Sequence, residues 1–255
     1  MSKWSFRWLL VLLAVVGLSA DQWSKYSMFR WLYNDGQPTE DKAAAFVAWN
    51  RAAPAWVAGT APGVEGGRYD VVPNWFGLIA QYNPPARKDP DDGWRNGLQT
   101  VSAPKLPHVN RGALFGMGAD QSGTKEAEEK AEGANNLFAV VSLIAAGGIA
   151  VWTVLRGKQA DAWICAALGL ILGGTVGNLY DRVVFHGVRD FLFFYKIDWP
   201  VFNVADCCLV CGAIMLVLHA VFVKPVKPDA ATTTAAAATT PAQAPAAVPA
   251  PTHAS

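Results

Sequence analysis

Residues 162–182 read AWICAALGLILGGTVGNLYDR. No charged side chain occurs from Ala162 to Tyr180, and a helix needs about 20 such residues to cross the hydrocarbon core of a bilayer. Two charged residues, Asp181 and Arg182, follow this run directly, and the polar residue Asn178 lies inside it. The stretch therefore predicts a membrane-spanning helix that carries functional groups at its end.

Three further apolar stretches accompany it. The first is uncharged over 8–20 and continues as an interrupted pattern to about residue 29. The others cover 133–155 and 203–223, the last with the carboxylate Asp206 near its start. Only 16% of the residues are charged, whereas a soluble domain usually has about a quarter. The composition predicts an all-α membrane protein with four transmembrane helices.

Several classes of function are disfavoured. A net charge of +1 without a basic stripe gives no indication of nucleic-acid binding. Four histidines without ligand spacing argue against a metal site. Cys208 and Cys211 have the C-x-x-C spacing of redox or metal sites, but they lie in an apolar run, as do Cys165 and Cys207. We interpret all four as helix-packing residues.

Basic residues predict the orientation, since short cytoplasmic segments are enriched in Lys and Arg. They flank the first stretch, the turn between the second and third, and the end of the fourth: Lys3, Arg7, Arg156, Lys158, Lys224 and Lys227. Both termini are therefore expected in the cytoplasm. The first stretch also resembles a cleavable signal peptide that ends at Gly17, Ser19 and Ala20. The polar motif after Ala20 favours a retained helix.

Composition divides the chain further. Residues 34–107 form a polar, Pro- and Gly-rich insert that is compatible with a small strand-rich subdomain, and 120–132 reads as a short solvated helix or loop. The stretch 228–255 is almost all Ala, Thr and Pro, which predicts a disordered tail. The remaining units are 1–33, the first helix with its flanks, and 108–227, a membrane bundle.

Ionisable residues at the ends of membrane spans are candidates for function. Asp21 and Lys25 are four residues apart and share a helix face, which is compatible with a structural ion pair. Asp190 and Asp206 lie in and after a short outer loop and can reach one point. Two neighbouring carboxylates share a proton and so offer an acid and a base. Spacing alone leaves hydrolysis and a proton or cation relay both open.

The polar motifs occur in a characteristic order. They read Asp21-Gln22-Trp23-Ser24-Lys25, Asn110-x-Gly112-Ala113-x-Phe115, Gly177-Asn178-x-x-Asp181-Arg182, Val188-x-Asp190-Phe191 and Phe202-Asn203-x-Ala205-Asp206. This order resembles the sequence blocks of bacterial signal peptidase II, a family of aspartic endopeptidases. The resemblance covers roughly 5–33 and 108–224. It leaves out the 34–107 insert, which is longer than the family's usual first outer loop.

The resemblance implies four transmembrane helices with a small periplasmic β-cradle, a periplasmic half-helix and a catalytic dyad at Asp190 and Asp206. The residues that it assigns to substrate binding or support of the dyad are Asn110, Gly112, Asn178, Asp181, Arg182 and Asn203. Asp21 and Lys25 would have a structural role.

The implied reaction removes the signal peptide from diacylglyceryl-modified prolipoproteins, just before the lipidated cysteine. It would take place at the periplasmic face of the bacterial inner membrane, in a monomer that needs no cofactor or metal. The partners would be lipidated prolipoproteins and membrane lipids, without nucleic acid. The alternative is a proton-coupled transporter with Asp190 and Asp206 as a relay, but the ionisable residues cluster on the outer side.

Overall fold

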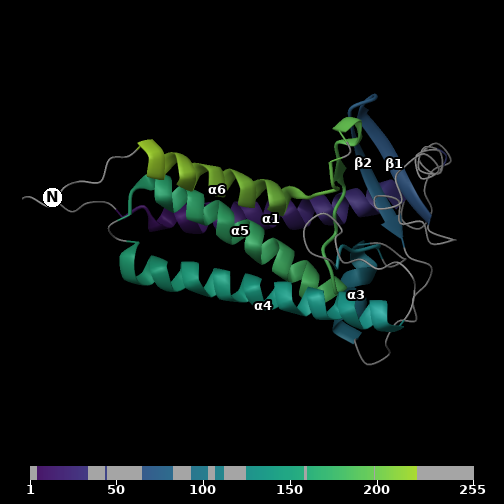
Figure 1. Ribbon diagram of the computed structural model, residues 1–255, viewed down its shortest axis with the longest axis horizontal. Coiled ribbons are helices and arrows are strands. Elements are labelled where there is room, and N and C mark those ends of the chain that lie inside the picture. The colour runs from purple at the N-terminus through teal and green to yellow at the C-terminus, as the bar shows by residue number, and fades with distance from the viewer. Residues whose placement is uncertain are drawn as a thin grey trace, which may run out of the picture.

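The computed structural model describes residues 5–33, 65–82, 93–102, 107–111, 125–157, 160–197 and 199–222, with the single residue 44. The elements are α1 (Arg7–Tyr33), β1 (Glu65–Val72), β2 (Phe76–Tyr82), α3 (Gly93–Ser102), α4 (Lys125–Arg156), α5 (Ala162–Phe185), β3 (Leu192–Phe193), the 3-10 turn η3 (Tyr195–Ile197) and α6 (Val204–Phe222). Four long helices lie side by side, with the sheet and α3 at one end (Figure 1). Gly112 and the 228–255 tail lie outside the described residues.

Helix α5 is the centre of the bundle, because it contacts α1, α4 and α6. It begins after Asp161, whose carboxylate Oδ1 accepts a hydrogen bond from the backbone N–H of Ile164 at 2.8 Å, as an N-cap does. It ends at His186, whose φ of 57° stops the helix and turns the chain. The loop that contains Asp190 starts at this turn.

Among the residues that the structure describes, three helices are long and apolar enough to cross a membrane, by length and composition: 128–156, 162–185 and 204–222. This confirms the prediction for the last three apolar stretches. Helix α1 is continuous over 27 residues, so its interrupted polar half belongs to the same helix as its apolar half. Residues 125–132 do not form a separate element, because they are the first turns of α4. Their Glu, Lys and Ala residues favour helix and nothing interrupts it.

Glycines on α5 allow α1 to approach closely. Gly169, Gly173 and Gly177 recur every four residues and so share one face of the helix. A Cβ atom at Gly173 would lie 2.8 Å from the carbonyl oxygen of Ala14, and one at Gly177 would lie 2.6 Å from Oδ2 of Asp21. Small residues at this spacing are typical of helix contacts in membranes, where backbones pack directly against each other.

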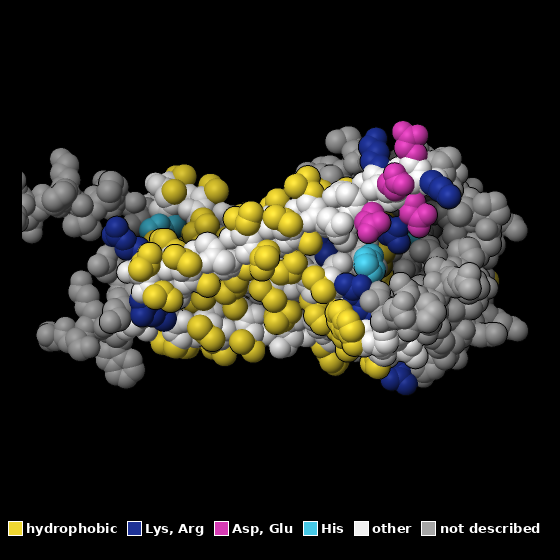
Figure 2. All heavy atoms as spheres, turned by 90° about the horizontal axis from the view of Figure 1, so that it is seen from below, with side chains coloured by type: hydrophobic (Ala, Val, Ile, Leu, Met, Phe, Trp, Pro, Cys, Tyr) yellow, Lys and Arg dark blue, Asp and Glu magenta, His cyan; other side chains and the backbone are white. Residues whose placement is uncertain are grey.

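The outer surface of the bundle is apolar. On α4, the exposed fractions of Leu143, Ile144 and Val154 are 62%, 68% and 71%. Figure 2 shows hydrophobic side chains along the length of the bundle, whereas Asp and Glu side chains gather at the end that carries the sheet. This distribution fits helices that face lipid along their length and water at the end with the sheet.

The sheet joins the insert to the loop after α5. Its strand order is β1-β2-β3, and both pairs are antiparallel. β2 pairs with β3 through Gly77 opposite Phe193 and Leu78 opposite Leu192. Beneath the sheet, a core cluster is formed by Phe29, Leu32, Ala80 and Phe191. The described strands of the insert and α3 pack directly onto the bundle, where they contact α1 and, for α3, also α5.

The glycine contact predicts a difference between two Gly→Ala variants. Gly173→Ala should lower stability by about 1–3 kcal/mol, because the new methyl group meets the backbone of α1 and cannot be accommodated by a side-chain movement. Gly148→Ala on α4 is the control, since a Cβ atom there meets nothing within 4 Å. The measurement is thermal unfolding in detergent. Equal midpoints for the two variants would contradict the close contact of α5 with α1.

Candidate active site

Asp206 is held by the first turn of α6. The backbone N–H of Asn203 donates to Asp206 Oδ2 at 3.1 Å, and the N–H of Asp206 donates to Asn203 Oδ1 at 3.1 Å. This reciprocal pair is a capping box, in which the residue before the helix and the third helical residue each satisfy the other's backbone N–H. The side chain of Asp206 is therefore fixed by local structure.

Asp190 lies in the loop that returns from α5 towards the sheet. Its Oδ1 accepts a hydrogen bond from Asn203 Nδ2 at 2.7 Å, and its Oδ2 accepts one from Asn110 Nδ2 at 3.1 Å. Asn110 is itself fixed by two backbone hydrogen bonds with Val188, of 2.8 and 2.9 Å. Asn203 thus contacts both carboxylates and keeps them close together.

Asn178 connects the carboxylates to charges deeper in the bundle. Its Nδ2 donates to Asp206 Oδ1 at 2.9 Å, while its Oδ1 accepts from Lys25 Nζ and from Asn203 Nδ2, both at 3.2 Å. An ammonium group only donates hydrogen bonds, so the amide oxygen has to face Lys25 and the amide nitrogen has to face Asp206. The orientation of the amide follows from the charge on Lys25.

The electrostatic environment favours a proton on Asp190. Burial by the surrounding protein and the negative charge of Asp206 raise the pKa of Asp190 to about 7, against the hydrogen bonds from Asn203 and Asn110, which lower it. A carboxyl group with this pKa keeps its proton in a large part of the molecules at neutral pH. The pair can therefore supply an acid and a base at once.

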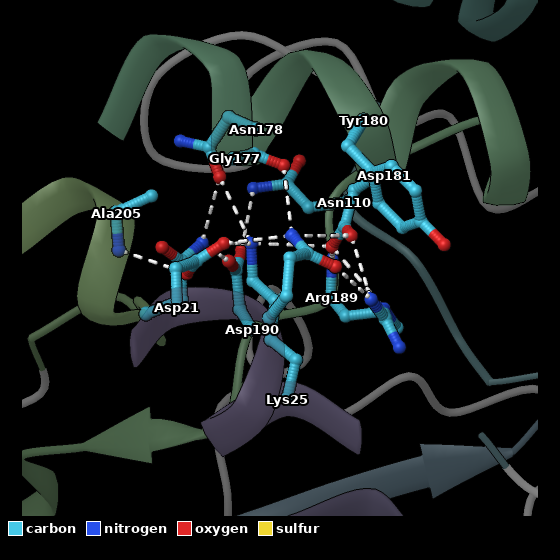
Figure 3. Close-up of polar contacts among 12 residues, drawn as sticks. Asp21, Lys25, Asn110, Gly177, Asn178, Tyr180, Asp181, Arg189, Asp190 and Ala205 are labelled. Atoms are coloured by element: carbon cyan, nitrogen blue, oxygen red, sulfur yellow. Dashed lines mark hydrogen bonds and ion pairs between the residues drawn. The ribbon is translucent and has the colours of Figure 1, made fainter. Parts of the chain in front are cut away.

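Behind the pair lies a cluster of four buried charges, Asp21, Lys25, Asp181 and Arg189, each with an exposed fraction of 0%. Lys25 Nζ is 2.8 Å from Asp21 Oδ2 and 3.2 Å from Asp181 Oδ2. With its bond to Asn178, the ammonium group thus has three acceptors (Figure 3). Arg189 NH2 lies 2.7 Å from Asp181 Oδ1. Two acids and two bases cancel, so the cluster carries no net charge.

The cluster joins α1, α5, α6 and the loop that follows α5. Asp21 Oδ1 accepts a hydrogen bond from the backbone N–H of Ala205 at 2.9 Å, in the first turn of α6. Asp181 Oδ2 accepts one from the backbone N–H of Arg189, also at 2.9 Å. The residues next to both candidate catalytic aspartates are therefore fixed by buried carboxylates.

The residues predicted to bind substrate or support the dyad differ in where they lie. Asn110, Asn178 and Asn203 bond the two carboxylates, while Asp181 is fully buried behind them. Arg182 instead turns towards α4, where it bonds Asn135 at 3.4 Å and lies 5.0 Å from the ring of Phe138. Asp181 thus pairs with Lys25 and Arg189, and not with its neighbour in the sequence. Gly112 is outside the described residues.

Three residues of this hydrogen-bond network were not predicted from the sequence. Gln22 bonds Asp21 and Arg189, and Ser102 bonds Arg189, while Asn135 bonds Arg182. Gln22 carries a signal, because it lies beside Asp21 on a helix and offers both a donor and an acceptor. Ser102 ends α3, a helix without an apolar run, and no pattern in the sequence connects it with the bundle.

The four cysteines are free thiols, with Cys165 buried and Cys207 and Cys211 exposed. The C-x-x-C pair is therefore not a disulfide in this structure. In the part of the chain that the structure describes, no group of three or more His, Cys, Asp or Glu residues is suited to hold a metal ion.

The fold and the site define a helical membrane protein with an amide-bound carboxylate pair at one end of its bundle. The sequence profile described as signal peptidase II matches residues 105–222. A lipoprotein signal peptidase of Vibrio cholerae is 36% identical over 129 residues, which are 49% of this chain and 70% of that protein. The chain belongs to the signal peptidase II family.

Other relatives align over a shorter part of their length. The lipoprotein signal peptidase of Rhodopirellula baltica is 38% identical over 44% of this chain and 50% of its own length. That of Pseudomonas aeruginosa is 39% identical over 43% of this chain and 60% of its own length. The chain thus spans about half to three fifths of these two relatives.

Two solved structures described as a bacterial membrane enzyme have the same fold. Their TM-scores are 0.52 and 0.50, and they cover 89% and 88% of this chain and 99% of their own chains. The sequence identities are 19% and 18%, so this likeness concerns the fold alone.

The buried cluster predicts a large effect on stability. Lys25→Met should destabilise the protein by about 3–5 kcal/mol, because Asp21 and Asp181 lose their shared counter-charge in a site without water access. Asp70→Asn is the control, since Asp70 forms its ion pair with Arg68 while its side chain is 40% exposed. An exposed pair contributes no more than about 1 kcal/mol. The measurement is again thermal unfolding in detergent, and a Lys25→Met variant as stable as Asp70→Asn would contradict the role of the cluster.

Proposed function

We propose that this protein is an aspartic endopeptidase that removes the signal peptide from diacylglyceryl-modified prolipoproteins, just before the lipidated cysteine. The observation that carries the proposal is the placement of Asp190 and Asp206 around one asparagine, Asn203. Membership of the signal peptidase II family supports the substrate class.

In the proposed mechanism, the two carboxylates activate a water molecule together. The ionised carboxylate of Asp206 takes a proton from the water, which attacks the carbonyl carbon of the scissile amide. The protonated carboxyl of Asp190 donates its proton to the carbonyl oxygen. When the tetrahedral intermediate collapses, the C–N bond breaks, Asp206 passes the proton from the water to the leaving nitrogen, and Asp190 regains a proton from a hydroxyl group of the intermediate. Asn203, Asn178 and Asn110 hold the carboxylates by amide hydrogen bonds, which keep their geometry without adding a charge.

The position of the pair suits a lipid-anchored substrate. Asp206 is in the first turn of α6, where this apolar helix meets the end of the bundle with the sheet. A substrate with a helical signal segment and two acyl chains approaches within the membrane, which brings its scissile bond to the same level. We propose that α1 is a fourth transmembrane helix and that the active site faces the periplasm.

The basic residues support this orientation of the membrane protein in the bacterial inner membrane. Arg7 and Arg156 begin α1 and end α4, at the end of the bundle opposite to the sheet. Positive residues favour the cytoplasmic side, which would place both termini there. The relay alternative is less well supported, since no charged side chain lies between Asp206 and His219 in α6.

The mechanism predicts that Asp190→Asn and Asp206→Asn each lower the cleavage rate by at least about a hundredfold, because an amide cannot exchange the proton. Asp161→Asn is the matched control at the opposite end of α5, where asparagine can still cap the helix. The measurement is the shortening of a purified lipidated prolipoprotein in detergent. Rates near the control for either variant would exclude that aspartate from the dyad.

The pKa of Asp190 predicts the dependence on pH. Because the acid form is required, kcat should fall as pH rises through about 7, where Asp190 loses its proton. The hydrogen bond from Asn110 lowers the pKa of Asp190, so Asn110→Ala should raise it and move the fall in kcat to higher pH. Rates from pH 5.5 to 9 measure the shift. A shift to lower pH would contradict the assignment of Asp190 as the acid.

A further inference from the structure

Helix α3, which belongs to the insert, contacts the cluster of buried charges. Its last residue, Ser102, has an exposed fraction of 0%, and its Oγ accepts a hydrogen bond from Arg189 NH1 at 3.0 Å. Gln99, three residues earlier on the same face, donates from Nε2 to the carbonyl oxygen of Val184 at 2.7 Å. The helix thus docks by two hydrogen bonds onto the end of α5 and the loop that follows it. It precedes residue 105, where the match to the family begins.

All three nitrogen atoms of the Arg189 guanidinium donate hydrogen bonds. Nε lies 3.2 Å from Asp181 Oδ2, and NH2 lies 2.7 Å from Asp181 Oδ1 and 2.9 Å from Gln22 Oε1. Its planar group lies 3.9 Å from the ring centroid of Phe185 and 4.3 Å from that of Tyr26. Ser102 supplies the acceptor for NH1, and a buried charged donor that loses its acceptor is costly.

Asp190 follows Arg189 in the chain, and adjacent Cα atoms are separated by a fixed ~3.8 Å. On its other side, the carbonyl oxygen of Phe191 accepts a hydrogen bond from the N–H of Ile79 in β2 at 2.9 Å. Asp190 is therefore held between two anchors, Arg189 and Phe191, and each of them bonds a residue of the insert. A shift of either anchor moves Asp190 relative to Asn203 and Asn110.

We propose that Ser102 is a positioning residue of the active site, which holds Asp190 in place through Arg189 and makes the insert a part of the catalytic unit. This inference rests on the proposed function. The resemblance in the sequence leaves out the 34–107 insert, whereas this hydrogen bond links a residue of the insert to the residue before Asp190.

The test compares two hydroxyl deletions on α3. Ser102→Ala should lower kcat roughly tenfold, with KM little changed, because it disturbs the reacting group and not the binding of substrate. Ser102→Thr, which keeps the hydroxyl, should recover most of the rate. Thr100→Ala is the control, since Thr100 is exposed and its hydroxyl bonds the carbonyl oxygen of Asn96 in the same helix. If Ser102→Ala keeps the kcat of Thr100→Ala, the proposal is overturned.

The pH profile separates positioning from poor folding. A smaller folded fraction scales the rate equally at every pH. Displacement of Asp190 changes its distances to Asn203, Asn110 and Asp206, which all act on its pKa, so the fall in kcat should move to a different pH. The other charged groups that act on Asp190, namely Asp206, Lys25 and Arg182, are unchanged in Ser102→Ala. If the pH profile of kcat in Ser102→Ala keeps the wild-type shape, and its rate only follows the folded fraction, Ser102 has a structural role alone. That result would overturn the proposal.

Hydrogen–deuterium exchange gives a readout that needs no activity. Arg189→Met should speed exchange in 93–102, because α3 loses its hydrogen bond to the loop that follows α5, whereas Asp70→Asn should leave this exchange unchanged. If the folded wild-type protein does not cleave a lipidated prolipoprotein, the proposed function fails while exchange still shows whether α3 docks through Arg189. Unchanged exchange in Arg189→Met would overturn the inference even in an active enzyme.

Discussion

The carboxylate of Asp181 pairs with the buried cations Lys25 and Arg189, and the arrangement of the other polar groups at this end of the bundle depends on these contacts. A charge without a counter-charge is costly in a site that excludes water, so Lys25 and Arg189 are held where Asp181 is. Lys25 brings α1 to α5, and Arg189 brings the loop after α5 back onto the same helix. One buried acid thus fixes three segments of the chain around the place where the candidate dyad lies.

The dyad is separated from these charges by amides. Lys25 bonds the oxygen of Asn178, and only the nitrogen of Asn178 reaches Asp206. A lysine in direct contact with the pair would favour its fully ionised form and remove the shared proton. The interposed asparagine keeps Lys25 out of direct contact with the pair, so burial and the charge of Asp206 remain the largest influences on the pKa of Asp190. The buried charges thus contribute to stability, while the neighbouring carboxylate pair carries the proposed proton transfer.

Close packing of α1 against α5 allows these buried charges to meet. The absence of a side chain at Gly177 leaves room for the carboxylate of Asp21, which then bonds the backbone of Ala205 in α6. At the same end, the insert contributes Ser102 and the β2 strand to the two sides of Asp190. The glycine face belongs to the part of the chain that the family shares, whereas α3 lies before it. The family bundle and the insert are therefore joined at the residue on which the chemistry is proposed to depend.

The sequence by itself determined the long apolar helices, because the thickness of a membrane sets their length and a run of apolar residues is visible locally. It also indicated Asp190, Asp206 and the asparagines, since polar groups at the ends of such runs are rare enough to stand out. Only the tertiary structure decided that Asp181 pairs with Arg189 and Lys25 and not with Arg182, and that Ser102 reaches Arg189 across 87 positions. The partner of a buried charge depends on which segments fold against each other. Neither the spacing of the residues nor the hydropathy of the chain predicts which segments these are.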